Sequence, residues 1–327
     1  MKVKFVTKLK IAQRMISTIR GPLSASLFIT RKCNLNCPYC RATKPDWQDL
    51  DAGAWFSIID RLRNWGVQLF SITGGEPMVR SDIYEIINHI SQTNRAIPWL
   101  ISNFKTMTRE NIDRLADAGL LFLTASLDSL SGKKVKSNAA ILDLLVYAKT
   151  KGIIPSTITV ISRDNLPEIA RIMKTVTERG IIFDVGLFQH VGGLFSPSEP
   201  TLKVVDFQRL DDVRKMMLNH KLKTGLIAPG WHFLNADWQY YQNMSWKCPS
   251  DRDAFLVVNN DGRLMPCQEF VSSIRVLDID SLDNPDWRRQ KAAIVNRCRG
   301  CFYGCYYQKV NVGFKDVILD IFTMLKV

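Results

Sequence analysis

The sequence predicts an α/β fold built on a parallel sheet, and two observations support this. Six short apolar runs typical of buried strands alternate with helical patterns between residues 23 and 200. A helix between successive strands brings the chain back to the same end of the sheet, so the strands run parallel and the helices lie outside. The chain is also long enough for a large core, with 327 residues and 46% hydrophobic composition.

The expected elements follow one another regularly. Strands are expected at residues 23–30, 67–73, 97–102, 120–127, 153–161 and 181–188. Helices are expected at residues 53–65, 82–93, 109–118, 139–151 and 166–179. The polar turn Ser196-Pro-Ser-Glu-Pro200 separates this unit from a helical stretch near 203–223. In parallel α/β folds the chemistry takes place at the carboxyl ends of the strands, so the residues that follow each strand are the functional candidates.

Three cysteines follow the first strand, at Cys33, Cys37 and Cys40. Their spacing, C-x3-C-x2-C, wraps a short loop around one soft metal centre, because thiolates favour zinc or iron–sulfur clusters. Structural zinc normally has four protein ligands, whereas three thiolates on a [4Fe–4S] cluster leave one iron open. An open iron is a binding site for a further molecule.

This loop, with the aromatic Tyr39 just before its last cysteine, resembles the signature of radical S-adenosylmethionine (SAM) enzymes. The resemblance implies a partial (βα)6 TIM-like barrel, a SAM-binding [4Fe–4S] cluster on the three thiolates, and Tyr39 beside the cofactor. It further implies that SAM is cleaved reductively to a 5′-deoxyadenosyl radical, which abstracts a hydrogen from the substrate. An electron donor such as flavodoxin or ferredoxin would then be a partner.

A glycine pair follows the second strand, in Thr73-Gly-Gly-Glu-Pro77. Glycines allow close backbone approach and positive φ, and a glutamate can accept from an ammonium group. A Gly-Gly sequence by itself is more often only a turn. The stretch is similar to the GGEP motif of radical SAM enzymes, which implies that Gly74, Gly75, Glu76 and Pro77 contact the amino group of the SAM methionine.

Short polar groups end three further strands. Ser102 and Asn103 follow the third strand, and Ser126 and Asp128 follow the fourth, where related enzymes have T-N-G and S-L-D. Such groups can bind the carboxylate or ribose of a nucleoside, but helix capping and Asx turns explain them equally well. Gln189 ends the sixth strand and is expected to face the cofactor.

The segment after Asp128 departs from the family pattern. Many relatives have a longer loop here, with a His-Asp and Arg-Gly pattern, whereas this chain has Ser129-Leu-Ser-Gly-Lys-Lys-Val-Lys136. The resemblance therefore assigns no ribose contact to this segment.

The other five cysteines lie in the C-terminal third, at Cys248, Cys267, Cys298, Cys301 and Cys305. The first two flank a predicted β-hairpin, in which residues 255–258 and 263–264 enclose the turn Asn259-Asn-Asp-Gly262. Four thiols from two such segments can complete a zinc site or a fully ligated [4Fe–4S] cluster, and the spacing does not separate these metals.

The C-terminal pattern is similar to the SPASM and twitch extensions of radical SAM enzymes. The resemblance implies one auxiliary [4Fe–4S] cluster, held by Cys248, Cys267, Cys298 and Cys301, with Cys305 either a further ligand or a spare thiol. The expected domains are a basic amphipathic segment at 1–22, the barrel at 23–200, a helical connector at 201–247 and the auxiliary cluster domain at 248–327. A helix with one apolar face is expected to close the chain at 314–325 and to dock on the barrel.

Composition narrows the location and the partners. There is no apolar run long enough to span a membrane and no signal peptide, so we expect a cytoplasmic protein, in which eight cysteines indicate metal binding rather than disulfides. The net charge of +13 favours an anionic partner, but no nucleic-acid-binding motif is present. The basic segment at 1–22 either packs on the domain or meets an anionic membrane surface.

Two classes of substrate fit these observations. The first is a small anionic or sugar-like biosynthetic metabolite, oxidised with help from the auxiliary cluster, and the absence of a recognisable leader-binding segment favours it. The second is a ribosomally made peptide that acquires a thioether, a carbon–carbon crosslink or an epimerised residue. A non-catalytic metal-binding module is a third possibility, which predicts no cleavage of SAM.

Overall fold

A computed structural model describes most of the chain. The described residues are 24–37, 39–40, 48–131, 136, 139–189, 201–236, 238, 253, 255–298 and 301–304. Several sequence-based expectations therefore concern residues outside the described ones: the basic segment at 1–22, the closing helix at 314–325, Cys248 and Cys305.

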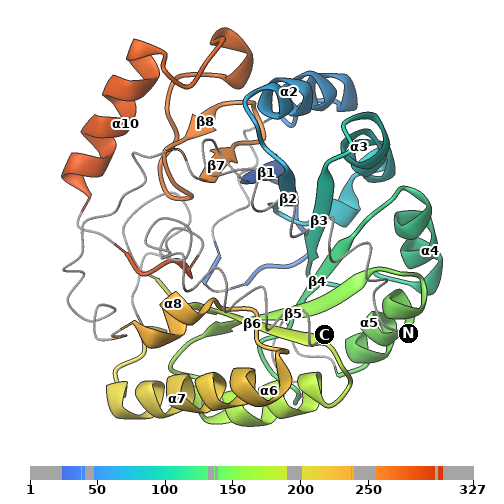
Figure 1. Cartoon of the computed structure of the whole chain (residues 1–327), viewed down its shortest axis with the longest axis vertical. Coiled ribbons are helices and arrows are strands. Elements are labelled where there is room, and N and C mark those ends of the chain that lie inside the picture. Colours follow the sequence, from blue (N-terminus) through green and yellow to red (C-terminus); the bar gives the residue numbers. More distant parts are fainter. Residues whose placement is uncertain are drawn as a thin grey trace.

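An eight-stranded sheet organises the fold, in the order β6-β5-β4-β3-β2-β1-β7-β8. The strands are β1 (Ser24–Thr30), β2 (Leu69–Gly74), β3 (Ile97–Ser102), β4 (Phe122–Ser126), β5 (Ile154–Ile161), β6 (Ile182–Leu187), β7 (Phe255–Val258) and β8 (Leu264–Met265). All neighbours pair in parallel except β7 and β8. The sheet curves as an open barrel with helices along its outside (Figure 1), which confirms the predicted partial (βα)6 barrel.

The helices follow the strands in the expected order. The longer ones are α2 (Ala52–Asn64), α3 (Ile83–Asn88), α4 (Arg109–Asp117), α5 (Ile141–Thr150), α6 (Ile169–Thr177), α7 (Phe207–Thr224) and α10 (Pro285–Arg297), with the single-turn α8 (Trp231–Asn235) between the last two. Local sequence sets their starts: Asp51 caps α2 by accepting from Ala54 N at 2.8 Å, and Thr108 forms a capping box with Asn111 at α4.

Two expected helices are divided in the structure. The predicted helix at 166–179 begins as the 3-10 turn η3 (Leu166–Glu168), which contains a proline, and continues as α6. The predicted helix at 82–93 is α3 followed by the π-helical turn η2 (His89–Thr93).

The two faces of the sheet differ in burial. Along β5 and β6 every second residue is buried, and the residues between are half-buried. The buried face packs on the helices, as where Phe183 and Val185 of β6 share a hydrophobic cluster with Ile172 and Val176 of α6. The half-buried face therefore lines the inside of the barrel, where the site is built.

The C-terminal hairpin continues the same sheet. β7 pairs with β1 in parallel, with Ser24 opposite Phe255 and Leu27 opposite Val258. All residues of β1 and β7 are buried, as is usual for strands covered on both faces. The hairpin was predicted, but its pairing with the first strand was not, although the continuous apolar run Phe255-Leu-Val-Val258 is typical of a central strand.

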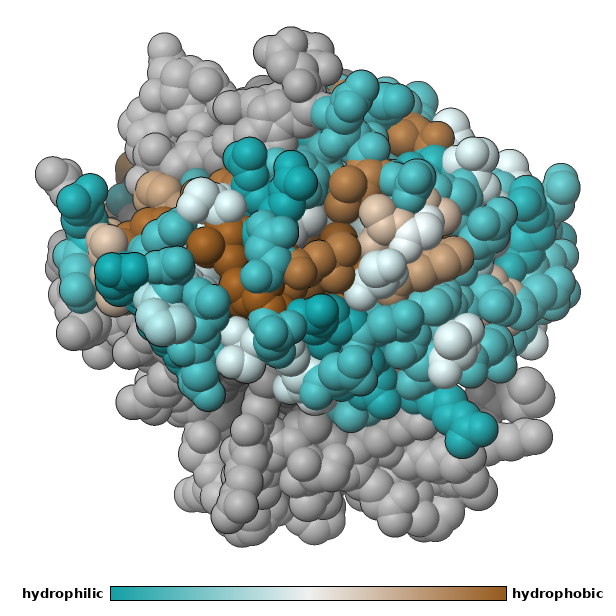
Figure 2. Space-filling model, turned by 90° about the horizontal axis from the view of Figure 1, so that it is seen from above, coloured by the Kyte–Doolittle hydropathy of each residue, from teal (hydrophilic) through white to brown (hydrophobic). Residues whose placement is uncertain are grey.

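Within the described part of the chain, no helix is both long and apolar enough to cross a bilayer. On the face shown in Figure 2, hydrophilic side chains cover most of the coloured surface, and the apolar ones gather towards its middle.

Candidate active site

The cysteine loop begins directly after β1, at one end of the barrel. Cys37 is buried, Cys33 is half-buried and Cys40 is exposed. A hydrogen bond from Cys40 N to Cys37 O, at 3.0 Å, closes a tight turn between the last two. Among the described residues, no three Cys, His, Asp or Glu side chains are gathered as a formed metal site.

The predicted Gly-Gly-Glu stretch packs directly on this loop. Gly75 N donates to Thr30 O at 2.8 Å, and Glu76 N donates to Lys32 O at 2.8 Å. A Cβ atom at position 75 would lie 2.1 Å from Lys32 O, so only glycine permits this approach. The glycines thus have a use that the sequence did not predict: they bring β2 against the backbone of the cysteine loop.

Glu76 is the central carboxylate of the site and is 1% exposed. It caps the turn η1 (Pro77–Val79) by accepting from Met78 N at 3.1 Å, and it accepts from Ser102 Oγ at 2.8 Å and Asn103 N at 2.7 Å. Burial raises the pKa of Glu76, while the hydrogen bonds from Asn103, Met78 and Ser102 oppose that rise. These donors stabilise the ionised form, which is the form that would accept from an ammonium group.

Asn103 connects the third strand to the first cysteine. Its Nδ2 donates to Asn34 Oδ1 at 2.8 Å and lies 3.8 Å from Cys33 Sγ. Its Oδ1 accepts from Lys105 N at 2.8 Å, which is an Asx turn. The Asx turn that the sequence analysis considered at these positions is therefore observed. Ser102 and Asn103 also donate hydrogen bonds to Glu76, and Asn103 donates to Asn34 of the cysteine loop.

Tyr39 and Asp128 form the second link between the loop and the barrel. The Tyr39 hydroxyl donates to the Asp128 carboxylate, whose other oxygen accepts from Val160 N at 2.9 Å. Burial raises the pKa of Tyr39, and the charge of Asp128 and the hydrogen bond to it act in the same direction. The residue before the last cysteine is thus a neutral donor that holds the loop against the end of β4.

Lys136 is a site residue that the sequence analysis did not assign. Its ammonium lies over the Tyr39 ring, 5.2 Å from the centroid. Burial raises the pKa of Cys33 and of Cys37, and the charge of Lys136 opposes that effect at both thiols. The lysine-rich segment that replaces the longer family loop was the available signal, because it places cations next to Asp128.

Asp184 is a second residue that the sequence analysis missed. In the sheet register Ser126 is opposite Ile158, and Ile158 is opposite Asp184, so the three side chains share the inner face of the barrel. Asp184 accepts from Val185 N at 2.8 Å, and burial raises its pKa to about 6. Nothing around this aspartate in the sequence marks it, since a single acid in an apolar strand has no motif.

The described cysteines of the extension also lie near one another. Burial raises the pKa of Cys267 to about 12, the hydrogen bond from Glu269 N opposes this, and the charges of Glu269 and Cys298 add to it. Glu269 also accepts from the Tyr303 hydroxyl at 2.5 Å, which brings the segment of Cys301 to the hairpin. Three of the predicted auxiliary ligands thus come from one region.

Gln189 lies between the barrel and the extension. It is buried at the end of β6, and its Oε1 accepts from Phe302 N at 3.2 Å. Its Nε2 is a buried donor that has no hydrogen-bond partner among the described residues. The side chain therefore joins the barrel to the segment that follows Cys301, and a contact with the cofactor stays a prediction.

The thiols of the first loop suit a three-thiolate cluster. Three cysteines lie within eight residues, next to the Lys136 cation and the polar groups that end β2, β3 and β4. A [4Fe–4S] cluster held by Cys33, Cys37 and Cys40 fits this donor set, because thiolates are its usual ligands. When bound, such a cluster supplies the electron that cleaves SAM.

Comparisons with known proteins agree with this chemistry. Residues 27–176 match the model of the radical SAM superfamily. The PqqA peptide cyclase of Bradyrhizobium diazoefficiens is 26% identical over 320 residues, which cover 89% of this chain and 80% of that protein. The GTP 3′,8-cyclase of Campylobacter curvus is 34% identical over 113 residues, which cover 33% of this chain and 35% of that protein.

Among solved structures, Streptococcus suis SuiB bound to its precursor peptide SuiA has the same fold. The TM-score is 0.65 at 18% identity, and the match covers 88% of this chain and 70% of that chain. These matches agree with three features of the structure: the cysteine loop, the Gly-Gly-Glu stretch packed on it and the open barrel. Residues 27–176 form a radical SAM domain, and the chain is an iron–sulfur enzyme with SAM as its cofactor.

Proposed function

We propose that this enzyme modifies a ribosomally made peptide by forming a crosslink within it. The observation that carries the proposal is the extent of the similarity to PqqA peptide cyclase, which covers 89% of the chain. That alignment is much longer than the radical SAM region at 27–176, so it includes residues beyond the barrel. A second support is the fold shared with SuiB, which was solved with a precursor peptide bound.

The inner face of the barrel is suited to receive a substrate side chain. Trp99 Nε1 donates to Thr124 Oγ1 at 2.6 Å, and Thr124 is hydrogen-bonded to Ser156 Oγ at 2.5 Å. These groups, with Ser126 and Asp184, give the inner face polar atoms beside apolar surface. A binding site with a few placed polar groups on an apolar wall can hold and orient a peptide side chain.

The small metabolite that the sequence analysis favoured has weaker support. The match to an enzyme named for a nucleotide substrate, the GTP 3′,8-cyclase, spans only 113 residues. The peptide alternative rests on an alignment of 320 residues. We therefore reverse the order of the two hypotheses and place the peptide first.

Crosslink formation removes two hydrogens from the peptide, and the proposal accounts for both. One would leave as a hydrogen atom, taken by the radical that SAM would supply when bound. The other leaves as a proton with one electron, and a second cluster held by Cys248, Cys267, Cys298 and Cys301 is the proposed acceptor of that electron. The described members of this set are buried or half-buried, which suits a cluster that exchanges electrons and binds no substrate. A flavodoxin- or ferredoxin-type donor would supply the electron for SAM cleavage.

The test uses the reconstituted enzyme with SAM, dithionite and each short peptide encoded beside its gene. We expect 5′-deoxyadenosine together with a peptide that has lost the mass of two hydrogens, and fragmentation should leave the crosslinked residues joined. The Cys37→Ala protein is the control and should yield neither product. Formation of 5′-deoxyadenosine with every such peptide unchanged, but with a small anionic or sugar-like metabolite oxidised, would restore the first hypothesis.

A further inference from the structure

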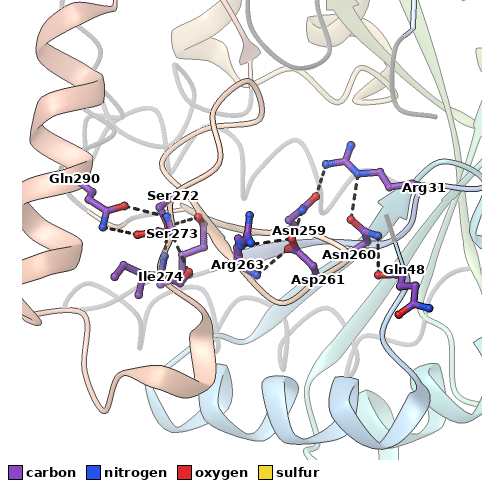
Figure 3. A network of polar contacts seen from close by, with 11 residues as sticks. Arg31, Gln48, Asn259, Asn260, Asp261, Arg263, Ser272, Ser273, Ile274 and Gln290 are labelled. Atoms are coloured by element: carbon purple, nitrogen blue, oxygen red, sulfur yellow. Dashed lines mark hydrogen bonds and ion pairs between the residues drawn. The ribbon is translucent and has the colours of Figure 1, made fainter. Parts of the chain in front are cut away.

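Arg31 is a buried cation placed directly before the cysteine loop. It is 2% exposed and lies two positions before Cys33. Its guanidinium donates to the side-chain oxygen of Asn259 and, at 3.3 Å, to that of Asn260 (Figure 3). Both asparagines are fully buried and belong to the turn between β7 and β8, which we call the hairpin turn (residues 259–262).

The hairpin turn also binds the other end of the cysteine-containing segment. Asn260 Nδ2 donates to Asp49 Oδ1 at 2.9 Å, and Asn260 O accepts from Leu50 N at 3.1 Å. Asp49 in turn accepts from Thr30 Oγ1 at 2.6 Å and from Arg31 N at 3.0 Å. The hairpin turn therefore fixes both ends of the segment between residues 31 and 49, in which all three cysteines of the loop lie.

Burying a guanidinium costs desolvation free energy unless its charge is compensated by other groups. An arginine keeps its charge at neutral pH, so the buried Arg31 side chain is a fixed cation two positions before Cys33. The same packing by a neutral side chain would avoid the desolvation of a charge. Net charge near an iron–sulfur cluster is one of the properties that set its reduction potential.

We propose that Arg31, held by the hairpin turn, is a positioning and electrostatic residue for the SAM-binding cluster. Reduction adds one negative charge to the cluster, and the buried guanidinium stabilises that charge, so the reduction potential is higher than it would be without Arg31. The C-terminal hairpin thereby contributes to the first step of the reaction although none of its cysteines binds the first cluster. The inference rests on a cluster at Cys33, Cys37 and Cys40 and does not depend on the peptide substrate.

The experiment is a potentiometric titration of the reconstituted full-length protein, followed by electron paramagnetic resonance. The signal that changes when SAM is added identifies the SAM-binding cluster and separates it from any second cluster. In Arg31→Met we expect the ratio of reduced to oxidised cluster at a fixed potential to fall about tenfold, which is 59 mV for one electron. Arg31→Lys keeps the charge and should stay within about threefold of wild type, which is less than half that shift.

A second variant keeps the test decisive if Arg31→Met fails to fold or to bind iron. Asn259→Asp is nearly the same size and still accepts the hydrogen bond from Arg31, but its carboxylate offsets the guanidinium charge. It should lower the potential in the same direction as Arg31→Met while retaining the iron content of wild type. Gln290→Ala is the matched control. It removes hydrogen bonds with Ser273 N at 3.0 Å and Ser273 Oγ at 2.7 Å, both of which lie within the C-terminal extension (Figure 3).

Three outcomes would overturn the proposal. The first is an unchanged potential in Asn259→Asp with iron retained. The second is an equal shift in Arg31→Met and Arg31→Lys, which would mean that packing and not charge matters. The third is a shift of the same size in Gln290→Ala, which would reflect general loosening of the extension. Loss of peptide modification alone, with the predicted potentials, would contradict the proposed function and leave this inference intact.

Discussion

The two cysteine regions of this enzyme are built in opposite ways. The loop of Cys33, Cys37 and Cys40 leaves one thiol exposed, and polar groups from β2, β3 and β4 converge on it: Glu76, Asn103 and Asp128. In the extension, Cys267, Cys298 and Cys301 are buried or half-buried, and the aromatic Phe302 beside Cys301 stacks on Phe233 with ring centroids 4.9 Å apart.

This difference separates a site that binds a ligand from one that is closed. Polar groups beside an exposed thiol would allow a polar cofactor to reach a cluster bound there, whereas aromatic packing around thiols would exclude it. Closely spaced cysteines can therefore form either an open site or a closed one, and the side chains that the fold places around them decide which. The predictions below test that contrast, starting from the largest expected effect.

Equivalent substitutions in the two regions should have different consequences. Cys37 and Cys301 are each 8% exposed, so replacing either by alanine removes a similarly buried thiol. Cys37→Ala should abolish formation of 5′-deoxyadenosine from SAM and dithionite, because the SAM-binding cluster loses a ligand. Cys301→Ala should lose iron but retain SAM cleavage. If both variants retained cleavage, the cysteine loop would not be the site of the SAM-binding cluster.

Alkylation of the iron-free protein should distinguish the two regions by accessibility. Burial raises the pKa of Cys267 to about 12, so at pH 8 only on the order of one thiol in ten thousand is the reactive thiolate. Cys40 is exposed and should react with iodoacetamide at least 100-fold faster, an order-of-magnitude expectation. Because a pKa of about 12 lies above the pH range of the assay, the alkylation rate at Cys267 should rise about tenfold for each pH unit. Peptide mapping measures both sites, and the two rates should become equal in urea.

Glu76→Gln tests the carboxylate at the centre of the open site. The amide keeps an acceptor for Asn103 N but removes the charge, and a hydrogen bond to a charged group contributes about 1.5–3 kcal/mol. We expect SAM to bind on the order of 10- to 100-fold more weakly with unchanged iron content, measured by calorimetry. Glu269→Gln, in the closed site, removes a buried carboxylate that also accepts hydrogen bonds and should leave SAM affinity unchanged. Equal losses in the two variants would contradict the assignment.

Tyr39→Phe should have the smallest effect. It removes the hydroxyl that donates to Asp128, and the carboxylate keeps its bond from Val160 N. We expect the free energy of unfolding in urea to fall by about 1.5 kcal/mol, with SAM affinity reduced a few-fold because the loop is held less firmly. Tyr147→Phe removes a hydroxyl that donates to the half-buried Asp113 at 2.9 Å and should cost less. A larger loss in Tyr147→Phe would mean that the link from Tyr39 to Asp128 is not what holds the loop.

The sequence by itself determined the family chemistry and the order of the elements. Spacing of thiols is local information, so Cys33, Cys37 and Cys40 were readable as one cluster site before any fold was known. The alternation of strands and helices was also readable, because each element carries its own periodicity and caps, as at Asp51 and Thr108. The hairpin of residues 255–264 was visible for the same reason.

Only the tertiary structure decided which groups meet. Lys136, Asp184 and Arg31 have no motif, and each becomes part of the site through neighbours far away in the chain, such as Asn259 for Arg31. The glycines at 74 and 75 were recognised, but their close packing on Thr30 and Lys32 depends on how β2 lies beside β1. Pairing of β7 with β1 joins residues more than two hundred positions apart. Hydrogen bonds and charges act over a few ångströms in space, whatever the separation in sequence, and so the fold alone places them.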